Sequence, residues 1–169
     1  MSDLKSTIVE AVIGVGGTAV AATIGMFGSA FLAEHYRRSR DARAIASGLA
    51  AELTVHLAAA PNVRRVLQSM ETRLADGRPL RLDIERESDK FYEANVGKIG
   101  LLEPELAERV IKVYQHIASF RSNFAIVLTG RVDVALERDL IHAAMQSVKT
   151  AEDLAAPLVV ALRSRAGRR

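Results

Sequence analysis

The chain has 169 residues, 49% hydrophobic and 25% charged, a balance that excludes a disordered chain and a membrane protein with many spans. It holds no cysteine, which excludes disulfides, thiolate metal sites and cysteine nucleophiles. Its net charge of +3 is too small to indicate nucleic-acid binding by itself. Good helix formers are abundant and β-branched residues occur singly, so the sequence predicts an all-α protein.

An uncharged stretch follows a short leader of residues 1–10 and runs from Ala11 to Ala33. Composition alone rarely produces 23 uncharged residues in a row at this overall charge content. As a helix the stretch spans about 35 Å, enough to cross a hydrocarbon core of about 30 Å. The sequence therefore predicts a single transmembrane helix at residues 11–33.

Basic residues flank this stretch unequally. Four arginines follow it closely: Arg37, Arg38, Arg40 and Arg43. The positive-inside rule then places the N-terminus outside and the rest of the chain in the cytoplasm, as in a single-pass protein of the inner (cytoplasmic) membrane. The same arginines are expected to contact anionic lipid headgroups.

Small residues recur every fourth position within the stretch, at Gly17, Ala21, Gly25, Ser29 and Ala33. They form one stripe of the helix, where another backbone can approach closely. The functional interpretation is packing against a second copy or a partner membrane helix. The alternative is that a span rich in glycine and alanine contains such a stripe by chance.

Two other interpretations of the same stretch are weaker. A cleaved signal peptide would have a positive leader and no arginine cluster after it, and here Asp3 and Glu10 lie in the leader. A dinucleotide-binding loop is suggested by Gly14-Val15-Gly16-Gly17-Thr18-Ala19, with Glu34 further on. That fold needs strands on both sides of a helix, and no such repeat follows.

Beyond the membrane, the helix is expected to continue as a stalk over residues 34–60, about 40 Å long, until Ala60-Pro61-Asn62 ends it. A shorter helix, Val63 to Ala75, is expected next, then a turn containing Gly77. A further helix is expected from Asp83 to about Val96. Residues 61–162 are assigned to a helical bundle and residues 163–169 to a flexible basic tail.

Two heptad-like seams give the clearest signal in the chain. A helix beginning at Pro104 and ending at Thr129-Gly130 carries the first seam, and a helix capped by Asp133 carries the second. The short link between them predicts an antiparallel C-terminal hairpin. The first seam is Leu106, Val110, Val113, Ile117, Phe120, Phe124 and Val127, and the second is Ile141, Ala144, Val148, Ala151, Ala155, Leu158 and Leu162.

No motif in the sequence indicates catalysis, a cofactor or a metal. The four histidines, His35, His56, His116 and His142, lack metal-ligand spacing, although His116 and His142 lie on neighbouring predicted helices. No phosphate-binding loop or serine elbow occurs. The acidic residues from Asp83 to Asp89 are interpreted as a solvated helix face with intrahelical ion pairs. The basic residues show no aromatic surface of the kind that binds nucleic acid.

One segment resembles a pattern in uncharacterised bacterial proteins that begin with a single membrane helix. The resemblance covers about 30 residues and implies a bacterial, membrane-anchored helical protein, without an activity or a site. The matching residues are Phe91-Tyr92-Glu93, Gly97, Gly100-Leu101-Leu102, Pro104-Glu105-Leu106, Val110 and Tyr114.

The preferred functional hypothesis is a membrane-anchored interaction or scaffold module that self-associates and is not an enzyme. The first alternative is a membrane-active effector or small channel assembled from glycine-rich helices, which the lack of an intramembrane charge disfavours. The second alternative is an enzymatic or ligand-binding bundle. A polar pocket among the helices would favour that alternative, and a dry apolar core would disfavour it.

Overall fold

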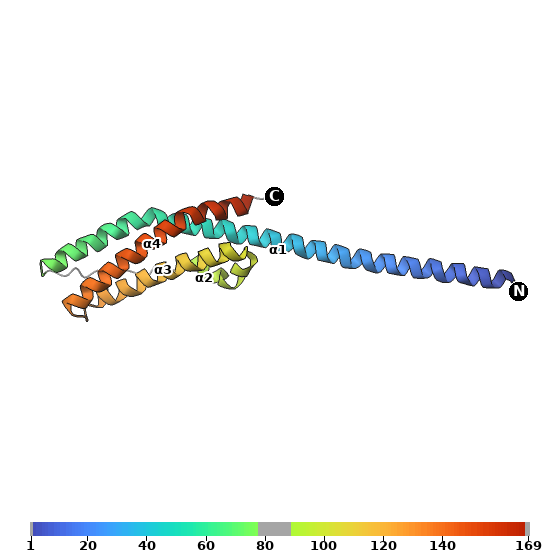
Figure 1. Cartoon of the computed structure of the whole chain (residues 1–169), viewed down its shortest axis with the longest axis horizontal. Helices are drawn as coiled ribbons and strands as arrows, with labels where there is room; N and C mark the ends of the chain where they lie inside the picture. Colours follow the sequence, from blue (N-terminus) through green and yellow to red (C-terminus); the bar gives the residue numbers. More distant parts are fainter. Residues whose placement is uncertain (1, 78–88, 168–169) are drawn as a thin grey trace. The chain divides into compact units, whose positions relative to one another are not determined.

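The structure is a computed structural model that describes the backbone of residues 2–77 and 89–167 and the side chains of residues 31–77 and 89–167. Within these ranges no strand occurs, and the predicted all-α class is confirmed. The elements in chain order are α1 (Ser2–Ala75), α2 (Lys90–Asn95), the 3-10 helix η1 (Val96–Leu101), α3 (Pro104–Thr129) and α4 (Val134–Gly167) (Figure 1).

The chain divides into two compact units, Met1–Asp41 and Ala42–Arg169, and the backbone of α1 runs through both. In the first unit the side chains are described from Phe31 onward, so nearly all of the predicted membrane segment lies outside the described side chains. At the start of the described part, Phe31, Leu32 and Tyr36 are 73%, 69% and 68% exposed. Large apolar side chains are thus uncovered where the uncharged stretch ends.

Helix α1 is long and apolar enough to cross a membrane by length and composition, and among the described side chains this holds for the stretch Phe31–Ala75. Leu49 and Leu53 in this stretch have no exposed surface, because they pack inside the second unit. The apolar character of this part of α1 is therefore that of a core helix.

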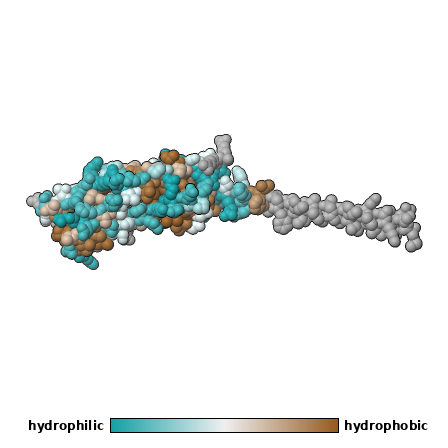
Figure 2. Space-filling view, viewed as in Figure 1, coloured by the Kyte–Doolittle hydropathy of each residue, from teal (hydrophilic) through white to brown (hydrophobic). Residues whose placement is uncertain are grey.

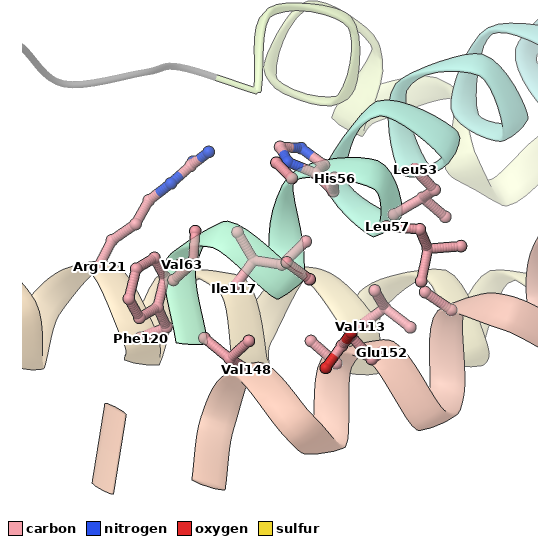
Figure 3. A pocket seen from close by; sticks show the side chains of 14 residues that line it. Leu53, His56, Leu57, Val63, Val113, Ile117, Phe120, Arg121, Val148 and Glu152 are labelled. Atoms are coloured by element: carbon pink, nitrogen blue, oxygen red, sulfur yellow. The ribbon is translucent and has the colours of Figure 1, made fainter. Parts of the chain in front are cut away.

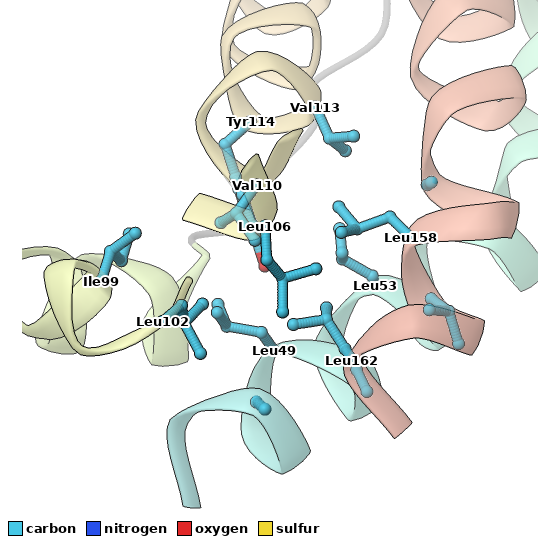
Figure 4. Packing of buried hydrophobic residues seen from close by; sticks show 14 of the residues in the cluster. Leu49, Leu53, Ile99, Leu102, Leu106, Val110, Val113, Tyr114, Leu158 and Leu162 are labelled. Atoms are coloured by element: carbon cyan, nitrogen blue, oxygen red, sulfur yellow. The ribbon is translucent and has the colours of Figure 1, made fainter. Parts of the chain in front are cut away.

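The second unit is a helical bundle in which the C-terminal part of α1 packs with α3 and α4. Its buried side chains form three apolar clusters in succession along the helices, and η1 closes the largest cluster with Ile99. Figure 4 shows large aliphatic side chains from these helices meeting in the largest cluster. Its members include Leu49, Leu53, Leu102, Leu106, Val110, Val113, Leu158 and Leu162.

Helices α3 and α4 form an antiparallel hairpin within one chain (Figure 1). The turn between them has the expected chemistry: Gly130 ends α3 with a φ of 63°, and Asp133 Oδ1 accepts a hydrogen bond from the Leu136 N–H. Every residue of both predicted seams lies inside the bundle, fully buried except for the partly buried Phe120 and Phe124.

Proline does not end helix α1 where the sequence predicts an end. Helix α1 continues through Pro61, so the expected break at Ala60-Pro61-Asn62 is wrong, and α4 likewise continues through Pro157. Both prolines are exposed, so their rings do not interrupt the packed face of either helix. Buried side chains before and after Pro61, including Ala60 and Leu67, hold both halves of the helix against the same neighbours.

The predicted stalk and tail also require correction. The bundle begins at Ala42, so most of the segment assigned to a stalk, residues 34–60, is part of the bundle, and its apolar face lies in the core. The basic tail is helical as far as Gly167. Its Arg163 donates a hydrogen bond to Thr54 Oγ1, and Arg165 Nε lies 2.8 Å from Glu103 Oε1. Arg168 and Arg169 lie outside the described residues.

Candidate functional site

The candidate site begins with charges that interrupt apolar helix faces. Glu52 is the only Asp, Glu, Lys or Arg between Arg43 and Arg64, and Arg121 is the only one between Lys112 and Arg131. His56 lies one turn after Glu52, on the same face of α1. Buried charges need partners, so these three side chains mark a place where the bundle must supply them.

Glu52 binds the start of α2. Its Oε1 accepts a hydrogen bond from the Phe91 N–H at 2.8 Å, and its Oε2 accepts one from the Tyr92 N–H at 3.1 Å. The Tyr114 hydroxyl of α3 donates a third hydrogen bond to Oε2 at 2.6 Å. The first N–H groups of a helix have no partner within the helix, so a carboxylate from α1 satisfies them across the bundle.

Asp89, immediately before α2, binds α3 and α1. Arg121 donates two hydrogen bonds to its carboxylate, at 2.6 and 2.9 Å, in the planar geometry that suits an arginine–carboxylate pair. His56 Nε2 lies 2.8 Å from Asp89 Oδ1. The Asp89 side chain is 8% exposed, so this ion pair is largely removed from water.

Aromatic contacts complete the attachment of α2. The rings of Tyr92 and Tyr114 stack with centroids 3.8 Å apart. Phe91 lies directly on the backbone of α1 at Gly48, where an added Cβ would come within 2.0 Å of its ring. Gly48 is therefore required for α2 to approach α1 this closely.

The ionisation states follow from this packing. Burial alone would raise the pKa of the Asp89 carboxyl, but His56 and Arg121 together outweigh burial and lower it below its ordinary value. Burial, and then the Glu52 carboxylate, raise the pKa of the Tyr114 hydroxyl. Burial and Asp89 raise the pKa of Tyr92 as well. Both tyrosines thus remain protonated at neutral pH, and Asp89 remains an anion.

Glu52, His56 and Asp89 have the ligand types of a cation site, and their ligand atoms lie within 4.8 Å of one another. However, both Glu52 oxygens already accept hydrogen bonds, and both Asp89 oxygens bind Arg121. A cation would have to displace a paired guanidinium. The cluster is better suited to fastening α2 and η1 to the bundle than to holding a metal.

A cavity of about 100 Å³ adjoins the cluster, between α1, α3 and α4 (Figure 3). His56 and Arg121 line one part of it and Glu152 lines another, and the remaining lining is apolar. Figure 3 shows His56 and Arg121 extending on the same side, with Ile117 and Val148 nearer the interior.

Sequence patterns alone do not reveal this site. By sequence His56 is one of four scattered histidines, and the prediction that Asp89 lies on a solvated helix face is wrong, because Asp89 is buried and bound to another helix. One feature of the sequence does indicate the site: Glu52 and Arg121 each stand alone as the charged residue in an otherwise uncharged helical stretch. No signal in the sequence pointed to Tyr114 or Tyr92 as partners.

The residues that the sequence did single out are dispersed. Gly17, Ala21, Gly25 and Ser29 lie outside the described side chains, and Ala33 is exposed. Arg37, Arg38 and Arg40 are exposed; Arg37 pairs with Glu34 at 3.4 Å and Arg40 with Asp41 at 3.6 Å, whereas Arg43 is half-buried. His142 lies 2.6 Å from Glu71 of α1.

No protein-family model matches this chain, and neither a curated protein nor a solved structure is significantly similar to it.

Proposed function

We propose that this chain is a membrane-anchored interaction module: residues 11–33 cross the inner membrane with the N-terminus outside, and the second unit is its cytoplasmic bundle. One observation carries the proposal. The uncharged stretch ends at exposed Phe31 and Leu32, and the arginines at positions 37–43 follow directly. Apolar surface next to a basic cluster is the arrangement expected where a helix leaves a bilayer on its cytoplasmic side.

Two further features support the proposal. Tyr36, 68% exposed, has the amphipathic ring that favours the headgroup level of a membrane. Hydrophilic side chains cover much of the face of the second unit seen in Figure 2, which suits a bundle surrounded by water. The hydrogen bonds of Glu52 and Asp89 hold the start of α2 against the bundle, as expected of a rigid module that presents a surface to partners.

Fractionation of cells expressing the full chain, with a reporter at each end, tests the anchor. We expect the protein to sediment with membranes and resist carbonate and high salt, with the C-terminal reporter active only in the cytoplasm. A matched variant, Ile24→Arg, places a charge in the middle of the segment and should reduce membrane retention. A wild-type chain released by carbonate, or an external C-terminus, would overturn the proposal.

The self-association part has its own test. Gly17→Leu with Gly25→Leu adds bulk on the small-residue stripe, whereas Ala19→Leu with Thr23→Leu adds it on the opposite side of the helix. We expect only the first pair to weaken association in a membrane-embedded energy-transfer assay. Equal association of both variants and the unmodified chain would exclude the stripe as the contact.

A further inference from the structure

The cavity lies where α1 and α4 contribute small side chains to the bundle. Ala60 of α1 and Ala151 and Ala155 of α4 line the cavity. Larger buried side chains lie beside them: Leu53 lines the cavity as well, Leu158 belongs to one adjoining cluster and Leu67 to another. Since interiors are normally close-packed, small side chains such as these alanines leave space that their neighbours do not fill.

The charged side chains that line the cavity already have partners outside it. Arg121 binds Asp89 through two hydrogen bonds, and Glu152 lies 2.7 Å from Arg64. A charged ligand would enter an apolar space without an available counter-charge, and burying an unpaired charge is strongly unfavourable. A neutral ligand avoids this penalty. His56 lines the cavity, and because its Nε2 faces Asp89, its second ring nitrogen, Nδ1, is left for one hydrogen-bonding group on the ligand.

We propose that this cavity is a binding site for a small neutral molecule, apolar except for one hydroxyl-like group and about the size of a single ring. Cavities of roughly this volume with apolar walls bind benzene-sized molecules in other proteins. The ligand's body would contact Ile117 and Val148, and its polar group would lie toward His56. The proposal concerns the second unit alone and does not depend on the membrane anchor.

Methyl NMR of the full chain in lipid nanodiscs provides the test. The Ile117 methyl group lines the cavity, whereas Ile141 belongs to a different cluster and serves as an internal control. Three probes share one ring and differ in charge: benzyl alcohol, benzoate and benzylamine. With the free aqueous concentration of each probe measured, we expect benzyl alcohol to shift the Ile117 signal saturably and to bind at least about tenfold more tightly than either charged probe.

Two alanines on the same helix give a matched pair of variants. Ala59 lines the cavity and is half-buried, whereas Ala58 is exposed and does not line it. Ala59→Leu should weaken benzyl alcohol binding by about tenfold or more, and Ala58→Leu should leave it unchanged. Ala155→Val, which fills the space from α4, is a second variant should Ala59→Leu fail to fold.

Three outcomes would overturn the proposal. The first is the absence of a saturable Ile117 shift up to the solubility limit of benzyl alcohol. The second is equal affinity for a charged probe and the neutral one. The third is the same loss of affinity in the Ala58 and Ala59 variants, since that would place binding outside the cavity.

Discussion

Two nearly uncharged stretches of α1, residues 11–33 and 44–60, look alike by composition and differ in what surrounds them. The first contains no charged residue, and at its end Phe31 and Leu32 are exposed. The second contains one, Glu52, and its Leu49 and Leu53 are fully buried against α3 and α4. The first is proposed to meet lipid, whereas the second is covered by protein.

Glu52, the single charged residue of the second stretch, accounts for the difference between the two stretches. A charge in the middle of a membrane span is costly, but a bundle can surround it with donors. Glu52 receives three hydrogen bonds from α2 and α3. An isolated charge in an apolar helix therefore indicates a helix that packs against protein, and the partners of that charge identify the attached element. The following predictions test this difference.

The largest effect is expected from removing a core leucine of the second stretch. Leu53→Ala should lower the free energy of unfolding of the bundle by about 3 kcal/mol, because Leu53 has no exposed surface. Leu32→Ala, at a side chain that is 69% exposed, should leave bundle stability unchanged. Urea unfolding of the full chain in nanodiscs, followed by near-ultraviolet circular dichroism of the stacked tyrosines, measures both. Equal losses would show that the two stretches are not distinct.

The next effect concerns the charge pair. Arg121→Ala should cost about 2 kcal/mol, because the buried Asp89 carboxylate loses two hydrogen bonds to a cation. Adding Asp89→Asn should restore part of the loss. Lys149→Ala removes an exposed pair with Asp153 and should have almost no effect. A loss in the Arg121 variant no larger than in the Lys149 variant would contradict the role assigned to Asp89.

A smaller effect is expected at the contact between α1 and α2. Gly48→Ala should cost about 1.5 kcal/mol and weaken the near-ultraviolet signal of Tyr92 and Tyr114, because the Phe91 ring must move off the helix. Gly97→Ala is the matched control, since a Cβ there meets nothing within 4 Å. The contact would be excluded if the two variants behaved alike.

The smallest effect is a dependence of stability on pH. The pKa of Asp89 is lower in the folded chain than the value of 3.8 for a free side chain, so the unfolded chain takes up the proton first as the pH falls. The contribution of Asp89 to stability should be complete above the unfolded-chain pKa of 3.8 and should be lost as the pH falls through the lower pKa of the folded chain. Thermal unfolding between about pH 5 and pH 3 should show a shallower slope for Asp89→Asn than for the unmodified chain. Parallel slopes would exclude Asp89 as the source.

Much of the fold could be predicted because it depends on local pattern. The bounds of α3, its cap at Gly130, the Asp133 cap and both seams follow from spacing along the chain. The site could not be predicted in the same way, since Glu52, Asp89 and Arg121 come from three distant segments. The predicted break at Pro61 is wrong because packing on both sides of Pro61 outweighs the local cost of losing one helical hydrogen bond.

The sequence by itself determined the helical class, the C-terminal hairpin and its buried faces, because helix periodicity and capping act within a few residues. Only the tertiary structure decided that residues 42–60 belong to the bundle, that Asp89 is held by Arg121 and His56, and that alanines of α1 and α4 line a cavity. These features depend on which side chains from distant segments meet in space, and the spacing of residues along the chain does not indicate those contacts.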